Sequence, residues 1–222
     1  MNTNPTAATI LCYGDSNTWG TRHDKRGRYA ADVRWTGVLQ QALGDEFYVI
    51  EEGLSSRTTD LEYTRKPGRN GRAYMEPCLD THGPLDVVIV MLGTNDMKIE
   101  FDRSAEQIAE AMRGLVQLIA DKTSKDAAKP TKEPARIVVV SPILMNEEAP
   151  YFRDWYEGFY DTFSVEKARQ LASLLEAIAR EMGCVFVDAA SVAQPGDDGL
   201  HMDMASHRAL GTLLAKKVHS LL

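Results

Sequence analysis

The chain has 222 residues, of which 44% are hydrophobic and 26% charged, with a formal net charge of −7 and a sequence pI near 5.3. This length suits one α/β domain with a sizeable core, so we expect a single domain over residues 1–222. The acidic balance, without a run of Lys and Arg, argues against nucleic-acid binding. No apolar segment reaches the roughly 20 residues of a membrane span, so we expect no membrane partner.

The cysteines and the first residues of the chain indicate the cellular compartment in which the protein is expected. Cys12, Cys78 and Cys184 are odd in number and widely spaced, which argues against a disulfide framework and against a CxxC metal site. The first nine residues, MNTNPTAAT, lack the basic and apolar segments of a signal peptide. We therefore expect a cytoplasmic protein.

Short apolar runs alternate with longer amphipathic segments along the chain. The runs predicted to be strands are 9–13, 47–50, 86–92, 137–140 and 184–187. The last three are continuous and rich in β-branched residues, which is typical of strands buried on both faces of a parallel sheet.

The segments between these runs have helical periodicity. Helices are predicted over 34–43, from a capping box at Ser104, over 164–182 and over 204–221. This alternation predicts an α/β fold, a three-layer α/β/α sandwich around a five-stranded parallel sheet. Two segments fall outside it: 122–135, which is charged and is predicted to be a solvated loop, and 145–163, which is rich in aromatic residues.

Polar residues cluster where the predicted strands end. Ser16 follows the first strand, the small-residue loop 51–59 the second and Asn95 the third, while Asp198 and His201 come shortly after the fifth. The carboxyl ends of parallel strands share one edge of the sheet, where ligands bind. We therefore expect these residues to meet in one cleft.

Each of these features also has a plain structural explanation. Asp15 and Ser16 could cap a helix, and 93–96 could be an ordinary turn. His201 differs from the other four histidines because Asp198 precedes it by three residues, with a glycine between them. This spacing lets the carboxylate reach Nδ1 while Nε2 faces outward, as a serine nucleophile requires.

These motifs resemble those of a known family. Gly-Asp-Ser at 14–16, Gly-x-Asn-Asp at 93–96 and Asp-x-x-His at 198–201 are similar to blocks I, III and V of the SGNH (GDSL) hydrolases. Segments 32–39, 49–59 and 88–98 resemble the oligomeric arylesterase/acyltransferase branch, some relatives of which deacetylate sugars. The resemblance implies a flavodoxin-like SGNH hydrolase fold, a homo-oligomer and hydrolysis of small short-chain esters such as acetates, with possible acyl transfer to alcohols.

The resemblance also implies roles for individual residues. Ser16 would be the nucleophile, His201 the general base and Asp198 the residue that orients it. The oxyanion hole would consist of the Ser16 backbone N–H, a backbone N–H of the second block and the Asn95 amide. The glycine of that second block falls at Ser56 here, which places the backbone donor at a serine.

The residues around the nucleophile are candidates for the substrate pocket. Asp15, Asn17 and Trp19 flank Ser16, and Asn17 stands where the family motif has leucine. Trp19 could limit the length of the acyl group or belong to the core. Acyl transfer on a serine requires neither a metal nor an organic cofactor.

Two other functions compete with this interpretation. A flavodoxin-like phosphate- or ligand-binding module would also have a Ser/Thr/Asn-rich loop after the first strand, but it has no need of an Asp-x-x-His motif. A metallo-phosphoesterase could use Asp15, Asn95 and His201 as ligands, although no HExxH or clustered His motif supports it.

The segment 151–163 contains seven of the 17 aromatic residues. Five of them follow helical spacing and would form one stripe: Phe152, Trp155, Tyr156, Phe159 and Phe163. The stripe could fold onto its own subunit. We expect instead a self-association surface that also walls the mouth of the active site.

Overall fold

The computed structural model describes residues 2–125 and 133–222. Its five strands form one parallel sheet in the order β2-β1-β3-β4-β5. The predicted fold class is confirmed. The strands are β1 (Ala8–Gly14), β2 (Phe47–Gly53), β3 (Val87–Met91), β4 (Arg136–Ser141) and β5 (Val185–Asp188).

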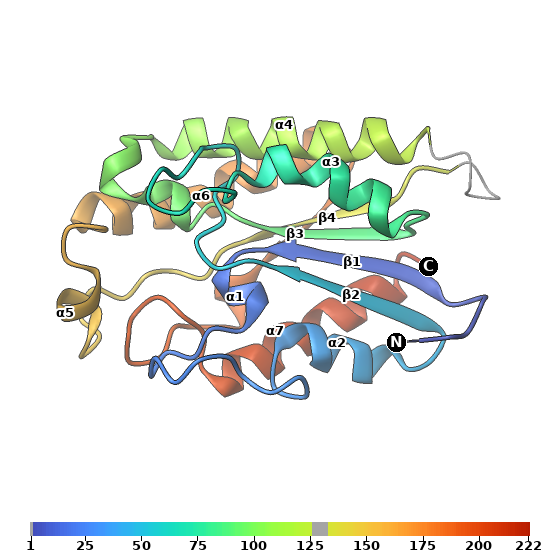
Figure 1. The fold of residues 1–222 in the computed structure, drawn as a ribbon, viewed down its shortest axis with the longest axis horizontal. Helices are drawn as coiled ribbons and strands as arrows, with labels where there is room; N and C mark the ends of the chain where they lie inside the picture. Colours follow the sequence, from blue (N-terminus) through green and yellow to red (C-terminus); the bar gives the residue numbers. More distant parts are fainter. Residues whose placement is uncertain (1, 126–132) are drawn as a thin grey trace.

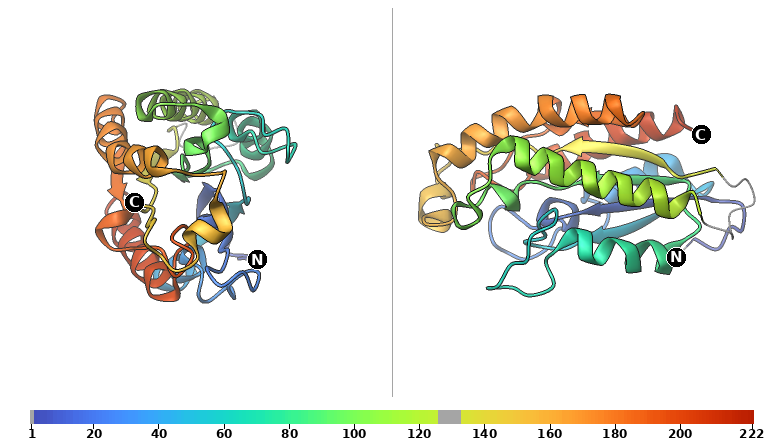
Figure 2. Two further views of the ribbon diagram at one scale, coloured as in Figure 1. Left: turned by 90° about the vertical axis from the view of Figure 1, so that its left-hand side faces the viewer. Right: turned by 90° about the horizontal axis from the view of Figure 1, so that it is seen from above.

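Helices cover both faces of this sheet. Figure 1 shows α3, α4 and α6 on one face and α2 and α7 on the other, and the end-on view of Figure 2 separates the layers. The short α1 and α5 lie at the carboxyl edge of the strands. The helices are α1 (Ser16–Trp19), α2 (Trp35–Leu43), α3 (Gly71–His82), α4 (Ala105–Thr123), α5 (Phe152–Tyr156), α6 (Thr162–Glu181) and α7 (Met204–His219).

The sheet separates two hydrophobic cores. Alternate residues of β1 point to opposite faces, because side chains alternate along a strand. Leu11 packs with the α3, α4 and α6 layer, whereas Ile10 packs with Trp35 of α2 and Leu214 of α7. All four side chains are fully buried. Burial on both faces explains why β1, β3 and β4 are mainly apolar, whereas the edge strand β2 is partly buried and contains Glu51 and Glu52.

The structure contains one helix, α3, that the sequence analysis did not predict. Gly71 and Pro77 lie within it, and both residue types are poor helix formers. Its start is fixed by Asn70, whose side chain accepts a hydrogen bond from the Ala73 N–H at 3.0 Å. Packing of Met75 and Cys78 into the core stabilises the helix despite its weak propensity.

Two segment predictions need correction. The aromatic segment 151–163 is not one helix: α5 ends at Tyr156 and α6 starts at Thr162, so the five aromatic residues do not share a helical stripe. The charged segment 122–135 begins inside α4, which continues to Thr123, while 126–132 lie outside the described residues. The capping box predicted at Ser104 is present, with Gln107 as its partner.

Candidate active site

Strand β1 delivers Ser16 to the carboxyl edge of the sheet. The strand ends at Gly14, where an added Cβ would lie 2.8 Å from the Met91 carbonyl oxygen, so a side chain would not fit beside β3. Asp15 caps α1 by accepting a hydrogen bond from the Asn17 N–H at 2.9 Å. Ser16 is therefore the first residue of a short helix held firmly against the strand tips, and its side chain reaches the cavity described below.

Three side chains form a continuous hydrogen-bond relay. The Ser16 Oγ lies 2.9 Å from Nε2 of His201, and Nδ1 of His201 lies 2.6 Å from Oδ2 of Asp198. The carboxylate fixes the tautomer with the proton on Nδ1, which leaves Nε2 free to accept the serine proton. All three residues are at least nine-tenths buried.

Asp198 is held as a carboxylate by the loop that follows β5. Its Oδ1 accepts hydrogen bonds from the backbone N–H groups of Leu200 and His201, at 2.9 and 2.8 Å. Burial favours the neutral acid, but the hydrogen bonds from His201 and from the backbone outweigh it and lower the pKa of Asp198. Gly199 turns this loop with a φ of 71°, a conformation that other residues rarely adopt.

A fourth side chain joins the relay from the aromatic segment. The Tyr156 hydroxyl donates to Oδ2 of Asp198 at 2.9 Å and lies 3.3 Å from Nδ1 of His201. Burial, together with the negative charge of Asp198, raises the pKa of the Tyr156 phenol far above its usual value. Tyr156 is therefore a permanent donor to the carboxylate, which now accepts four hydrogen bonds.

Two further groups at the strand tips carry donors suited to an oxyanion. Ser56 adopts a φ of 69°, the left-handed region that favours glycine and is uncommon for other residues. Within the described residues, the backbone N–H groups of Ser16 and Ser56 have no acceptor. Nδ2 of Asn95 donates to the Arg57 carbonyl at 3.0 Å and has only a long 3.5 Å contact with Asp15. Three donors are thus available beside Ser16.

Buried hydrogen bonds connect the loops that follow the strand tips. Arg57 is 2% exposed, and its guanidinium donates to the Gly14 carbonyl at 2.9 Å and to the Glu52 carbonyl. Both carboxylate oxygens of Asp96 accept from the Thr59 N–H at 3.0 Å. These bonds tie β1, β2 and β3 together where their loops begin, which fixes the donors in place.

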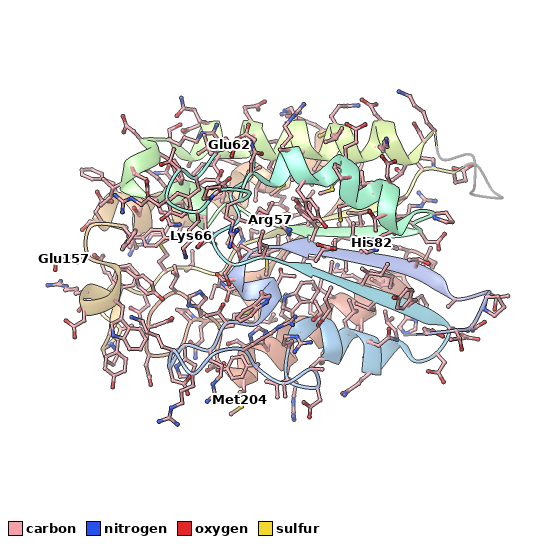
Figure 3. All side chains as sticks on the ribbon, in the orientation of Figure 1. Arg57, Glu62, Lys66, His82, Glu157 and Met204 are labelled. Atoms are coloured by element: carbon pink, nitrogen blue, oxygen red, sulfur yellow. The ribbon has the colours of Figure 1, made fainter. Side chains whose placement is uncertain are left out.

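The relay opens into a cavity of about 380 Å³, within the range of small-ligand sites. Its lining includes both aromatic side chains and cations, and Figure 3 shows Lys66 on the side of the molecule where the strands end. The lining residues are Ser16, Thr21, Ser55, Ser56, Tyr63, Arg65, Lys66, Asn95, Lys98, Trp155, Tyr156, Phe159, Tyr160, Leu200 and His201.

The structure places Asp15, Asn17 and Trp19 behind the cavity wall rather than in it. Asp15 is occupied in capping α1. The Asn17 side chain donates to the Leu200 carbonyl at 3.2 Å and accepts from the Met202 N–H at 2.9 Å, so it clamps the histidine loop to α1. Ser16 is thus the one residue of α1 that lines the cavity.

Comparison with known protein families finds a match over nearly the whole chain. A model of the GDSL-like lipase/acylhydrolase family matches residues 12–219. The chain belongs to this family. It is accordingly a carboxylic ester hydrolase of the SGNH type, and the resemblance noted in the sequence is confirmed.

Three relatives show which kinds of esterase this chain is similar to. The aryl esterase of M. smegmatis is 43% identical, with a TM-score of 0.88 over 97% of this chain and 100% of that one. A carbohydrate acetylesterase from Sinorhizobium meliloti is 36% identical, with a TM-score of 0.88 and the same coverage. An acetylxylan esterase from Xylanibacter ruminicola is 26% identical over 96% of this chain, which spans only 43% of that protein.

The competing interpretations find less support. Within residues 2–125 and 133–222, one group of three or more metal-capable side chains has its ligand atoms close together, namely Glu52, Cys78 and His82. Glu52 already pairs with His82 at 2.8 Å, and none of the three lines the cavity. Figure 3 shows His82 along the sheet, away from Lys66.

Within residues 2–125 and 133–222, no helix combines the length and apolar character needed to cross a membrane.

The sequence analysis expected Tyr156 near the mouth of the site but missed its contact with Asp198, and it did not assign Arg57 or Lys98 to the site. Tyr156 reaches Asp198 from 42 positions earlier in the chain, and no periodic pattern signals that contact. Arg57 is hidden in a loop where an arginine looks solvated. Lys98, which is 5% exposed and donates to Oδ1 of Asn95 at 2.9 Å, had a usable signal: it is a cation three residues after the block III asparagine.

Proposed function

We propose that this chain is a serine esterase that hydrolyses short-chain, acetyl-type esters of aryl or carbohydrate alcohols through an acyl-enzyme on Ser16. The observation that carries the proposal is the relay from Ser16 through His201 to Asp198, with separations of 2.9 and 2.6 Å. The identities of the aryl esterase and of the carbohydrate acetylesterase support the choice of alcohol. The cavity of about 380 Å³ favours small substrates.

The reaction follows from the roles of the relay. His201 Nε2 takes the Ser16 proton as Oγ attacks the ester carbonyl, and the imidazolium that forms is stabilised by Asp198. The negative charge on the carbonyl oxygen is stabilised by the Ser16 and Ser56 N–H groups and by the Asn95 amide. His201 then gives its proton to the departing alcohol, and water repeats the sequence on the acyl-enzyme.

The proposal is tested with p-nitrophenyl esters from acetate to long chains, run beside acetylated sugars. Activity should be highest with the shortest acyl groups. Ser16→Ala should abolish turnover without changing the melting temperature, and a phosphonate probe should label Ser16 alone. Near-normal activity of the alanine variant, or labelling at another residue, would show that the nucleophile is misassigned.

We further propose acyl transfer to alcohols, because Trp155 and Phe159 wall the cavity and would limit the access of water to the acyl-enzyme. The ratio of transfer to hydrolysis with an added alcohol measures this. Replacement of both side chains by alanine should lower the ratio, and an unaltered ratio would remove the basis for the proposal.

We propose a homo-oligomer in the cytoplasm, formed by a single domain over residues 1–222. Phe163 is 75% and Tyr151 43% exposed at the two ends of the aromatic segment, which suits a contact between subunits. The three cysteines are free thiols, as in a reducing compartment. Light scattering on the wild type and on Phe163→Ser tests assembly. A monomeric wild type would refute the proposed homo-oligomer. Cell fractionation tests the compartment.

A further inference from the structure

The cavity beside Ser16 has an unusual charge balance for this chain. The protein as a whole carries a net charge of −7, yet within the described residues the cavity lining contains Arg65, Lys66 and Lys98 and no carboxylate. Arg65 is partly neutralised by Glu100 at 3.7 Å. The two lysines are not: within the described residues, neither belongs to a salt bridge.

Both lysines lie one hydrogen bond from a donor of the oxyanion site. Lys98 Nζ donates to Oδ1 of Asn95 at 2.9 Å, and Lys66 Nζ donates to Oγ of Ser56 at 3.1 Å. They reach the cavity from different loops, Lys66 from the loop after β2 and Lys98 from the turn after β3. Their convergence is therefore built by the tertiary fold.

Lys98 is the more constrained of the two. It is 5% exposed and stacks at 4.3 Å from the centroid of the Tyr63 ring. A buried ammonium without a counter-ion is unfavourable, and a second cation beside it adds repulsion. Burial and then the like charge of Lys66 lower the pKa of Lys98 to about 8, although Glu100, Asp15 and Asp96 act in the opposite direction from further away.

We propose that Lys98 and Lys66 form an anion subsite, so that the preferred substrates are esters whose alcohol part carries a carboxylate or another anionic group. A bound anion would supply the missing counter-charge and relieve the repulsion between the two ammonium groups. The apolar part of the cavity lining, to which Phe159 and Leu200 belong, would contact the ring or sugar that links the anion to the ester. This inference rests on the proposed esterase function.

A competing explanation is that the lysines assist only the oxyanion of the reacting carbonyl. In that case their removal would slow every ester to the same extent. The two explanations separate when an anionic ester is compared with a neutral ester of the same shape.

The test uses 4-acetoxybenzoate and 4-acetoxybenzamide, which share the acyl group and ring and differ in one negative charge. The measured quantity is the ratio of their kcat/KM values in each variant, so that their intrinsic reactivities cancel between variants. Lys66→Gln should lower the ratio by about two- to fivefold, as for an exposed charge pair. Lys98→Met should lower it by about tenfold or more, as for a hydrogen bond to a charged group. Rising ionic strength should lower the wild-type ratio.

The matched control is Lys217→Gln, which removes the same charge from the exposed face of α7 and should leave the ratio unchanged. Binding provides a readout that does not need turnover: calorimetry should show that 4-hydroxybenzoate binds more tightly than 4-hydroxybenzamide, and that Lys66→Gln reduces the difference. Lys66 is exposed, so this variant should fold even where Lys98→Met does not.

An unchanged ratio in both Lys66→Gln and Lys98→Met, with no binding preference for the anionic phenol, would overturn the inference. Failure of the esterase proposal has another signature. In that case neither acetoxy compound is hydrolysed and Ser16 is not labelled, while the binding preference still decides whether the anion subsite exists.

Discussion

The contact of Tyr156 with Asp198 predicts a specific change in the pH dependence of the enzyme. Tyr156→Phe removes one of the four hydrogen bonds that Asp198 accepts and leaves the ring, and hence the packing against Tyr160, in place. Without the hydroxyl, more of the carboxylate charge acts on the His201 imidazolium and stabilises it. The base must be unprotonated to act, so higher pH is needed to free it.

The magnitude follows from the strength of the lost bond. A hydrogen bond to a charged group contributes about 1.5–3 kcal/mol. If about a third of this hydrogen-bond energy passes to the imidazolium through the shared Oδ2 atom of Asp198, the variant stabilises the His201 imidazolium by about 0.5–1 kcal/mol more than the wild type does. Since one pH unit corresponds to about 1.4 kcal/mol, the acid limb of the kcat/KM profile should move up by about 0.5 pH units. The plateau should fall less than tenfold, because the His201 tautomer is still fixed by Asp198.

The assay is the pH profile of p-nitrophenyl acetate hydrolysis by the wild type, Tyr156→Phe and Tyr160→Phe. The control removes a hydroxyl from the same cavity, one for which the described residues provide no hydrogen bond. Its acid limb should stay in place. An acid limb that is unmoved in Tyr156→Phe, or that shifts to lower pH, would refute the reasoning.

Further variants test the other parts of the site and the fold. Asn95→Ala should lower kcat by about 10²–10³ with a smaller change in KM, since the amide acts on charge formed in the transition state; a normal kcat with a raised KM would assign it to substrate binding. Asp198→Asn should slow hydrolysis strongly but less than His201→Ala, and the reverse order would contradict the assigned roles. His207 is buried, which lowers its pKa to about 4, so it folds neutral and the unfolded chain binds more protons between about pH 4 and 6.5. The free energy of unfolding should therefore fall by up to about 3 kcal/mol as the pH drops through this window, and urea denaturation of His207→Asn should show a flatter dependence.

Much of the fold could be predicted from local patterns. Four of the five strands end at Gly, Ser or Asp, and β3 ends two residues before Gly93. Burial on both faces of the parallel sheet requires the apolar composition of β1, β3 and β4. The α3 helix was missed because tertiary packing overrides the poor propensity of Gly71 and Pro77. Propensity describes the isolated segment, whereas the stability of a short helix comes mainly from the surface it buries.

The catalytic residues of the site could likewise be predicted from the sequence, whereas the residues that surround them could not. Ser16, Asn95 and His201 follow strands whose carboxyl ends must share an edge, so strand order alone brings them together. The contacts of Tyr156 with Asp198, and of Asn17 with Leu200 and Met202, join segments 42 to 185 positions apart. Such contacts depend on the paths of loops, which no periodicity records. The tertiary structure alone therefore decided that Asn17 clamps a loop, that Tyr156 binds the relay carboxylate and that two lysines meet beside the nucleophile.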